Sequence, residues 1–336
     1  MSLSFQKLRV GVLRGGPSAE YKVSLETGRN VLDNLYEEHY SPLDIFISRD
    51  GVWHDGGLEK SPESILGKVD VVFNALHGKY GEDGEVQRIM DHFQTPYTGS
   101  NALSSAMGMN KIISKKIYNN IGLKTPFSLE IREEDLTREA IREAYRNVPM
   151  PFVIKPASSG SSVGVYIAHS LSELEEATLS AFEYSPQVLI EEFINGKEAT
   201  CGVIDDFRGT AHYALLPIEI RPQSKNFFDY NEKYSDQGAE EICPGNFSSQ
   251  EKKALESMSI LAHKHLGLRH YSRSDFKVHP KRGVFILETN SLPGLTKNSL
   301  LPKSLTAIGS NIKEFLHHVI QIALRPSLSR SGITSA

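Results

Sequence analysis

The first hundred residues alternate between short apolar runs and amphipathic stretches. Residues 8–14 (LRVGVLR) form an apolar run ending at a Gly-Gly turn, and residues 19–36 then place apolar side chains at helical spacing. Residues 43–47 and 69–76 are further runs of strand length, and residues 95–100 (TPYTGS) close the segment. Strands separated by helical stretches predict a parallel sheet with helices on its faces, which is an α/β arrangement.

The middle of the chain changes from helical to strand patterns. Residues 101–150 predict mostly helix, with one helix ending at Gly122 shortly before Pro126. Residues 151–156 (PFVIKP) and 162–168 (SVGVYIA) predict a β-hairpin, whose connecting loop is made of small residues.

The last part of the chain mixes strands and helices around one long polar segment. Residues 221–247 are polar and aromatic, and a segment of this length without periodicity is usually functional or disordered. The prediction is completed by helices at 171–183, 249–266 and about 303–324, and by strands at 187–194, 198–204, 212–220, 271–278 and 283–290.

Composition limits the class of protein. The chain has 336 residues, of which 39% are hydrophobic, and this suffices for two or three packed domains. A net charge of −4 and a pI near 6.3 argue against a general binder of nucleic acid or of membrane surfaces. The start of the chain has no long apolar run, so we expect neither a signal peptide nor a membrane helix.

The cysteines and the tail of the chain add two expectations. Cys201 and Cys243 are the only cysteines and form no C-x-x-C pair, which favours two reduced thiols in a cytoplasmic protein over a disulfide. Residues 326–336 are small, polar and basic, and predict a disordered end.

Acidic and amide side chains gather on the last predicted strand pair. Glu288 and Asn290 share one face of their strand, and Asp275 ends a short run in the preceding strand. Either carboxylate alone would be interpreted as a solvated charge, but carboxylate and amide oxygens together suit Mg²⁺, especially when phosphates complete the octahedron. Arg273 lies two residues before Asp275, where a guanidinium could stabilise negative charge developing on a metal-bound oxygen.

Lysines and small residues could surround phosphates at the same place. Lys155 ends an apolar strand and begins the loop KPASSGSSVGV, whose glycines allow backbone N–H groups to approach an anion. This loop is not the G-x-x-x-x-G-K-[ST] loop of P-loop proteins, because its lysine comes first rather than last. Lys111 and Lys233 alone would be ordinary surface lysines.

Two further residues of the N-terminal segment have chemical and structural interpretations. Glu20 lies in a first helical turn, where it could complement the helix dipole or hold a substrate ammonium group. His77 follows a buried strand and precedes glycine, so it could face a cleft or be a structural histidine.

Taken together, these stretches resemble the D-alanine–D-alanine ligase family of the ATP-grasp superfamily. The resemblance covers about residues 8–324, and the motifs occur in family order. They are GGPSAEYKVSL, NALHGKYGEDGEVQ, PYTGS, NKIISKKI, PFVIKPASSGSSVGV, LIEEFINGKEAT, FFDYNEKY, SRSDF and LETNSLPGLTKNSLLP.

The resemblance implies three domains and a tail. The N-terminal α/β domain would span residues 1–103, the central ATP-grasp part 104–190, and the C-terminal ATP-grasp part 191–325. Residues 221–247 would form a lid, and the α+β character would belong to the ATP-grasp parts. We further expect a homodimer in the cytoplasm that binds no nucleic acid and no membrane.

The resemblance also implies an ATP site. Adenine would lie against Glu191 and against the backbone of Phe193 and Ile194, and ribose would bind Glu198. The phosphates would meet Lys111, Lys155 and Lys233, and two Mg²⁺ ions, for which Mn²⁺ could substitute, would be held by Asp275, Glu288 and Asn290.

The implied reaction joins two D-alanine molecules through an acyl phosphate. Arg273 and the backbone N–H of Gly294 would stabilise the tetrahedral oxyanion. Substrate groups would bind Glu20, His77, Ser299 and the Leu300 backbone, and Ser161, Tyr234 and Glu20 would form a bridge that closes the site.

Three residues depart from the family pattern, and alternative functions stay open. Ser159 stands where relatives usually have glutamate, Asn110 where they have aspartate, and Phe228 where they have tyrosine. Tyr234 favours an amine acceptor over D-lactate. The alternatives are a ligase with another acceptor, D-lactate or D-serine, and a non-catalytic nucleotide-binding relative.

Overall fold

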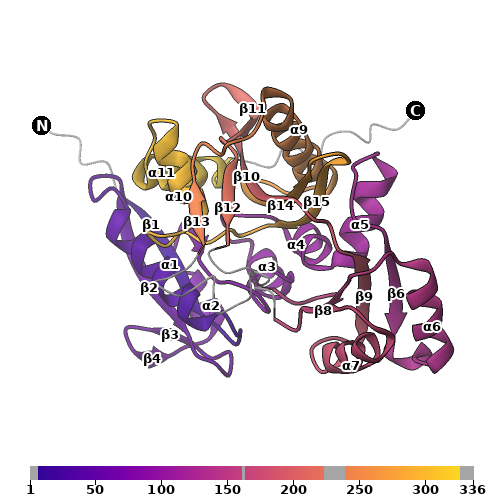
Figure 1. The fold of residues 1–336 in the computed structure, drawn as a ribbon. Helices are drawn as coiled ribbons and strands as arrows, with labels where there is room; N and C mark the ends of the chain where they lie inside the picture. Colours follow the sequence, from indigo (N-terminus) through magenta and orange to yellow (C-terminus); the bar gives the residue numbers. More distant parts are fainter. Residues whose placement is uncertain (1–6, 161–162, 223–238, 326–336) are drawn as a thin grey trace, which may run out of the picture.

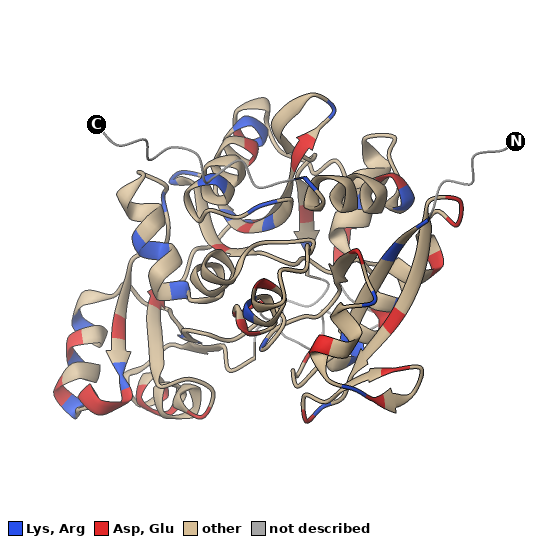
Figure 2. Cartoon of the chain, turned by 180° about the vertical axis from the view of Figure 1, so that it is seen from behind, with Lys and Arg blue, Asp and Glu red and all other residues tan. Residues whose placement is uncertain are grey.

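The computed structural model describes residues 7–160, 163–222 and 239–325. The described residues form three β-sheets with α-helices packed beside them (Figure 1). In the described segments, no helix combines the length and apolarity needed to cross a membrane. Acidic and basic residues are interspersed along most of the elements, as the view from behind shows (Figure 2).

The N-terminal sheet has the strand order β4-β3-β2-β1-β5. Strand β1 lies between β2 and β5 and pairs in parallel with both, whereas β3 and β4 add an antiparallel edge. The elements are β1 (Leu8–Gly15), α1 (Tyr21–Asn34), β2 (Tyr40–Ile47), β3 (Trp53–Asp55), β4 (Leu58–Glu59), α2 (Pro62–Leu66), β5 (Val71–Asn74) and α3 (Glu85–His92). The predicted parallel α/β segment is therefore confirmed, while β3, β4 and α2 were not predicted.

The central sheet is antiparallel, with the order β6-β9-β7-β8, and α6 and α7 pack on it through a shared apolar core. The predicted hairpin is the β7–β8 pair. The elements are α4 (Ala102–Met109), α5 (Lys111–Asn120), β6 (Ser128–Arg132), α6 (Arg138–Asn147), β7 (Phe152–Pro156), β8 (Tyr166–Ala168), α7 (Leu171–Phe182) and β9 (Gln187–Glu192). The strand β6 interrupts a segment that was predicted to be mostly helical.

The third sheet has the order β13-β12-β10-β14-β15, with β11 paired to β10. All its pairs are antiparallel, which confirms the α+β character of this part. The elements are β10 (Lys197–Phe207), β11 (Thr210–Ala214), β12 (Ile218–Arg221), β13 (Glu240–Ile242), α9 (Ser249–His265), β14 (Tyr271–His279), β15 (Gly283–Asn290), α10 (Leu300–Ala307) and α11 (Ile312–Ala323).

Three predicted elements of this part needed correction. The single strand at 212–220 is divided into β11 and β12, because Pro217 cannot donate to a sheet ladder. The single C-terminal helix is divided at Gly309, which has a φ of +72°, and Asn311 begins the second helix as its N-cap. The segment 221–247 is not loop throughout, because β13 pairs with β12.

The C-terminal helix α11 returns to the N-terminal sheet. Phe315 and Val319 lie in one buried cluster with Val12 and Phe73 of β1 and β5. The first and last parts of the chain are thus joined by a common core, as Figure 1 shows for α11 beside the N-terminal elements. The two cysteines form no disulfide with each other, and Cys201 is buried while Cys243 is half-buried.

Candidate active site

A cavity lies between the central sheet and the third sheet. Strands β7 and β9 supply one wall, and β10, β14 and β15 supply the other. The lining residues are Lys111, Pro126, Val153, Lys155, Ser159, Val165, Glu191, Glu192, Phe193, Ile194, Glu198, Asp275, Lys277, Leu287 and Glu288. Eight residues predicted for the ATP and metal sites are among them: Lys111, Lys155, Glu191, Phe193, Ile194, Glu198, Asp275 and Glu288.

The wall formed by the central sheet contains a buried charge cluster. Glu191 on β9 forms ion pairs with two lysines, with Oε1 2.7 Å from Nζ of Lys115 and Oε2 2.7 Å from Nζ of Lys155. Lys155 reaches Glu191 because β7 and β9 are antiparallel neighbours, and Lys115 comes from α5. The carboxylate side chain is only 3% exposed, so both ion pairs are shielded from solvent.

Burial and charge act in opposite directions on this cluster. Burial alone would raise the pKa of Glu191, but the ammonium groups of Lys115 and Lys155 outweigh it and lower the pKa to about 2. Burial lowers the pKa of Lys115. Burial also acts to lower the pKa of Lys155, but Glu191, with Glu288 and Glu198 beyond it, raises that pKa overall. Lys155 is thus held as a cation at the cavity wall.

The opposite wall carries oxygen ligands on β14 and β15. These strands pair so that Arg273 lies opposite Asn290 and Asp275 opposite Glu288. The register then shifts between Asp275 and Phe276, which leaves Leu287 as an extra residue that also lines the cavity. This β-bulge re-aims the side chains at the end of the pair, as bulges near active sites commonly do.

Asp275 is the centre of a polar network on this wall. Arg273 donates from Nε to Oδ1 and from Nη2 to Oδ2, each at 2.9 Å, in a bidentate pair. Thr200 on β10 donates to Oδ1 at 2.6 Å, and Nδ2 of Asn290 donates to Oδ2 at 3.2 Å. The structure therefore brings together Arg273, Asp275 and Asn290, which the sequence placed near one another.

The donor set fits Mg²⁺. Asp275 and Glu288 lie directly opposite each other on paired strands, and both are partly exposed at the cavity. Asn290 makes a direct contact with Asp275, so its amide belongs to the same group. Two carboxylates that line the cavity, with an amide that contacts one of them, offer a hard oxygen set, which Mg²⁺ prefers when phosphates supply further ligands.

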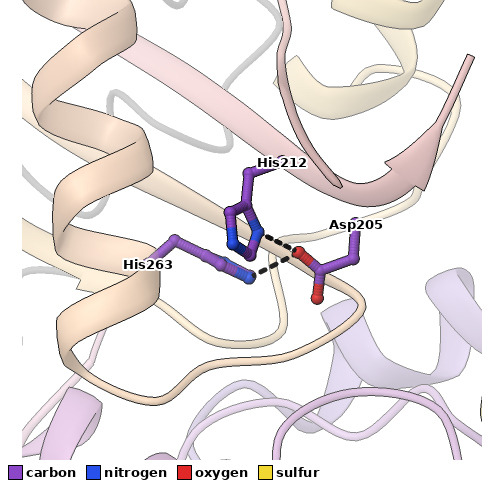
Figure 3. A group of neighbouring side chains, drawn as sticks. All are labelled: Asp205, His212 and His263. Carbon is purple, nitrogen blue, oxygen red and sulfur yellow. Dashed lines mark hydrogen bonds and ion pairs between the residues drawn. The ribbon is translucent and has the colours of Figure 1, made fainter. Parts of the chain in front are cut away.

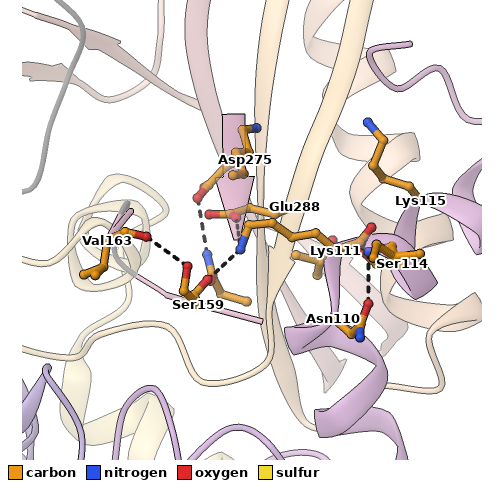
Figure 4. A network of polar contacts seen from close by, with 12 residues as sticks. Asn110, Lys111, Ser114, Lys115, Ser159, Val163, Asp275 and Glu288 are labelled. Carbon is orange, nitrogen blue, oxygen red and sulfur yellow. Dashed lines mark hydrogen bonds and ion pairs between the residues drawn. The ribbon is translucent and has the colours of Figure 1, made fainter. Parts of the chain in front are cut away.

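Lys111 connects the two walls (Figure 4). Its Nζ lies 3.3 Å from Oε2 of Glu288 and donates at 2.6 Å to the carbonyl oxygen of Ser159 in the β7–β8 loop. The hydroxyl of Ser159 donates to the Val163 carbonyl at 3.0 Å, which closes the described part of that loop on itself. Lys111 is thus placed between the oxygen ligands and the small-residue loop.

The departure at Asn110 has a structural explanation. Its side-chain oxygen accepts hydrogen bonds from the N–H groups of Ile112 and Ile113, at 3.0 and 3.1 Å, and so caps α5. Asparagine and aspartate are about equally good N-caps, so either residue fixes the start of the helix that carries Lys111.

Glu198 on β10 is held by a lysine that the sequence analysis had not singled out. Nζ of Lys277 lies 2.8 Å from its Oε2, and both residues line the cavity. Lys115, Thr200 and Lys277 are the contributors that were missed. The signal for Thr200 and Lys277 was available, because each shares a strand face with a predicted site residue, Glu198 and Asp275 respectively.

Glu20 lies where three loops meet. A Cβ built on Gly160 would lie 2.8 Å from its Oε2, and one built on Gly78 would lie 2.7 Å away. Both loops can therefore approach the carboxylate only because these positions lack a side chain. The structure thus brings the N-terminal turn, the loop after β5 and the β7–β8 loop to one carboxylate.

His77 is buried beside this carboxylate. Nδ1 donates to the carbonyl of Leu292 at 3.1 Å, and Nε2 lies 2.9 Å from the hydroxyl of Thr27. Burial acts to lower the pKa of His77, but the carboxylates of Glu82 and Glu20 raise it overall. The histidine therefore links α1 to the loop that follows β15, which is a structural role beside the site.

The loop after β15 brings Gly294 and Ser299 together. A Cβ on Gly294 would lie 3.0 Å from the Ser299 hydroxyl, and that hydroxyl accepts a hydrogen bond from the N–H of Thr296 at 3.0 Å. Ser299 is the N-cap of α10, which begins at Leu300, so free N–H groups of a first helical turn face this region. Asn30 of α1 donates to the Leu295 carbonyl at 2.6 Å.

Four residues of the predictions lie outside the described residues: Ser161, Phe228, Lys233 and Tyr234. The predicted closing bridge and the lid lysine therefore stay predictions.

The fold and the site together define a class of protein. Two antiparallel sheets enclose a cavity with lysines on one wall and oxygen ligands on the other, which is an ATP-grasp arrangement. Residues 117–321 match the family described as D-ala D-ala ligase C-terminus, and residues 9–65 and 54–100 match D-ala D-ala ligase N-terminus. The chain belongs to the D-alanine–D-alanine ligase family and is an enzyme of the ligase class.

Individual relatives agree with this assignment. A D-alanine–D-alanine ligase of Clostridium beijerinckii is 36% identical over 325 residues, which is 95% of this chain and 100% of the relative. The corresponding structure from Bacillus anthracis has a TM-score of 0.78 at 34% identity and covers 95% of this chain and 98% of its own. A D-Ala:D-Ser ligase, VanG of Enterococcus faecalis, has a TM-score of 0.84 at 30% identity, with 95% and 100% covered.

Proposed function

We propose that this chain joins two D-alanine molecules to D-alanyl-D-alanine at the expense of ATP, for peptidoglycan precursor synthesis. The observation that carries the proposal is the cavity itself, in which Lys155 and Lys111 face Asp275 and Glu288. The names of the relatives support it, and one Bacillus anthracis structure of the same family, with a TM-score of 0.76, is complexed with ATP.

Each part of ATP would meet a different part of the cavity. The adenine would lie against Glu191 and the backbone of Phe193 and Ile194, where β9 ends. The ribose would bind Glu198, whose carboxylate Lys277 orients. Lys111 and Lys155, joined by Lys233 of the lid, would hold the phosphates.

Asp275, Glu288 and Asn290 would hold Mg²⁺. Bound there, the ions would neutralise phosphate charge and align the transferred group. Arg273 orients Asp275 through its bidentate pair.

The chemistry proceeds in two displacements. The carboxylate of the first D-alanine attacks the γ-phosphorus of ATP, the bond to the β-γ bridging oxygen breaks, and ADP leaves. The amine of the second D-alanine then attacks the acyl carbonyl, loses a proton, and expels phosphate. Arg273 and the backbone N–H of Gly294 stabilise the oxyanion formed in the second step.

Substrate groups would be held at the junction of the three loops. Glu20 would bind the ammonium group of the first D-alanine, with His77 supporting the loop behind it. The second carboxylate would bind Ser299 and the N–H of Leu300 at the start of α10. Ser161 and Tyr234 would connect to Glu20 and exclude water from the acyl phosphate.

The organisation of the protein follows from the same family membership. We propose domains at residues 1–103, 104–190 and 191–325, a homodimer, and a cytoplasmic location where ATP is available. Sedimentation velocity of the full chain tests the dimer directly, because a monomer at micromolar concentration contradicts it.

The experiment that tests the function is phosphate release with ATP and Mg²⁺ across a panel of acceptors. We expect release that depends on D-alanine and forms D-alanyl-D-alanine. Predominant formation of the depsipeptide with D-lactate, or of the mixed dipeptide with D-serine, would show the alternative acceptor. Binding of ATP without amino-acid-dependent release would show a non-catalytic relative.

The D-serine alternative rests on one observation, the high structural similarity to the D-Ala:D-Ser ligase of Enterococcus faecalis. The acceptor panel therefore includes a competition in which D-alanine and D-serine are present at equal concentration. We expect D-alanine to be preferred, since the family matches and the closely similar relatives carry the D-alanine–D-alanine ligase name.

A further inference from the structure

A second cluster of polar side chains lies outside the ATP cavity, and Figure 3 shows its three residues. It consists of Asp205 near the end of β10, His212 on β11 and His263 in the last turn of α9. Asp205 is separated from Glu198 by about 23 Å along β10, at the usual rise of a strand. The cluster therefore does not belong to the site described above.

One carboxylate oxygen is shared by both imidazoles. Oδ1 of Asp205 lies 2.8 Å from Nδ1 of His212 and 3.0 Å from Nε2 of His263. The three atoms all lie within 4.8 Å of one another. The other oxygen, Oδ2, accepts a hydrogen bond from the N–H of His270 at 2.6 Å, which fixes the carboxylate so that Oδ1 points at the histidines.

Hydrogen bonding does not satisfy His263. Its side chain is 0% exposed, and Nδ1 lies 2.8 Å from the hydroxyl of Ser272. Nε2 is close to Oδ1 of Asp205, but the contact is not aligned as a hydrogen bond, and within the described residues this atom has no other partner. A buried ring nitrogen in this position is costly unless something accepts or shares its lone pair.

The donor set has a recognisable ligand chemistry. Two imidazoles and one carboxylate are the ligands of many sites for Zn²⁺ and other first-row divalent ions. Ligands about 2.0–2.1 Å from a tetrahedral ion lie roughly 3.3 Å apart, so the two separations from Oδ1, 2.8 and 3.0 Å, need to open by only a few tenths of an ångström. The hard-oxygen set at Asp275 and Glu288 has no such nitrogen donors.

The surroundings provide the other requirements of a metal site. The hydroxyl of Ser272 can accept the proton of His263 Nδ1, which leaves Nε2 unprotonated toward the ion, as in most histidine–metal sites. The His212 side chain is 34% exposed, so an ion can enter from solvent and water can complete the coordination.

We propose that Asp205, His212 and His263 form a structural site for Zn²⁺ or a similar divalent transition-metal ion. The ion would connect the β10–β11 hairpin to the end of α9. Because ions that bind only the folded chain add to its stability, it would raise the melting temperature without taking part in the reaction at the ATP cavity.

The direct test titrates the metal-free full chain with Co²⁺ in excess Mg²⁺. Four-coordinate Co²⁺ with nitrogen ligands absorbs strongly in the visible, whereas six-coordinate Co²⁺ on oxygen ligands absorbs weakly, so the two sites are distinguishable. We expect one equivalent of strongly absorbing Co²⁺, displaced by one equivalent of Zn²⁺, and a higher melting temperature with Zn²⁺ than with chelator.

Three variants assign the ion to this cluster. His212→Ala should weaken Zn²⁺ affinity at least about 100-fold, and Ser272→Ala about tenfold, because loss of an outer partner costs about 10- to 100-fold. His265→Ala is the matched control, since His265 is an exposed histidine on the same helix α9 and should change nothing. Ligase activity with Mg²⁺ should be the same in all three variants.

Two results would overturn the proposal. One is a wild-type chain that shows no strongly absorbing Co²⁺. The other is a strong absorption that persists unchanged in His212→Ala, or that is lost equally in His265→Ala, either of which places the ion elsewhere. Circular dichroism of His212→Ala confirms that any loss reflects the ligand rather than unfolding, and His263→Gln provides a second ligand variant.

Discussion

The two walls of the ATP cavity differ in how far their charged side chains are buried and paired. On the central sheet, Glu191 is almost fully buried between Lys115 and Lys155, and each of its oxygens is committed to one ammonium group. On the third sheet, Asp275 and Glu288 are partly exposed and line the cavity. We call the first wall, with Glu191, Lys115 and Lys155, the closed wall, because its charges pair with one another. We call the second wall, with Asp275 and Glu288, the open wall, because its oxygens can bind an ion.

Because the two walls differ in burial and charge pairing, we expect them to contribute differently to binding and to reaction. A buried, fully paired cluster resists rearrangement, because breaking it leaves an uncompensated charge in a low-dielectric region. An open oxygen set can bind and release its ligands with each turnover. We therefore expect changes on the second wall to affect the reaction, and changes on the first wall to affect nucleotide binding and stability.

The largest expected effect comes from the open wall. Glu288→Gln removes a charge that would hold Mg²⁺, so phosphate release should fall about 1000-fold, as for loss of a main electrostatic contributor. Rates of release with saturating ATP and D-alanine measure this. Circular dichroism should show an unchanged fold, and near-normal turnover would refute the metal assignment.

The next effect separates the two lysines of the closed wall. Lys155→Met should lower ATP affinity about 10- to 100-fold, because a charge-assisted contact with phosphate is lost. Lys115→Met is the matched control: this lysine also pairs with Glu191, but we assign it no contact with ATP. Equal losses of ATP affinity in both variants, measured by calorimetry, would contradict the division between them.

The ion pairs of Glu191 should also make the free energy of unfolding depend on pH in the acid range. The folded-state pKa of Glu191 is lowered to about 2, so its contribution to stability is complete above the ordinary pKa of 4.5 and disappears as the pH falls toward 2. At about 1.4 kcal/mol per pKa unit, roughly 3 kcal/mol is at stake. Urea unfolding at several pH values should show a shallower decline for Glu191→Gln than for the wild type, and parallel declines would argue against the cluster.

The smallest expected effect concerns the helix that carries both Lys111 and Lys115. Asn110→Ala removes the N-cap of α5 and should lower the free energy of unfolding by about 1 kcal/mol. Asn110→Asp keeps an acceptor at the same place and should restore that stability, as thermal unfolding would show. If aspartate destabilises the chain as much as alanine, the capping role is wrong.

The sequence predicted the open wall better than the closed wall. Asp275, Glu288 and Asn290 could be found because they sit on two successive strands, where alternation alone places side chains on one face. Lys115 gave no such signal, because its partner Glu191 is 76 residues away and the pairing depends on how α5 packs against β9. The bulge at Leu287 was also invisible, since it is a property of strand pairing.

The sequence by itself determined most of the strands and helices, the family and the types of residue that carry the chemistry, because periodicity and local motifs act over a few residues. Only the tertiary structure decided that Glu191 bridges two lysines, that α11 completes the N-terminal core, and that Asp205, His212 and His263 meet on three elements. These features join residues far apart in the chain. Burial then fixes their charges and contacts, and no local pattern encodes burial of that kind.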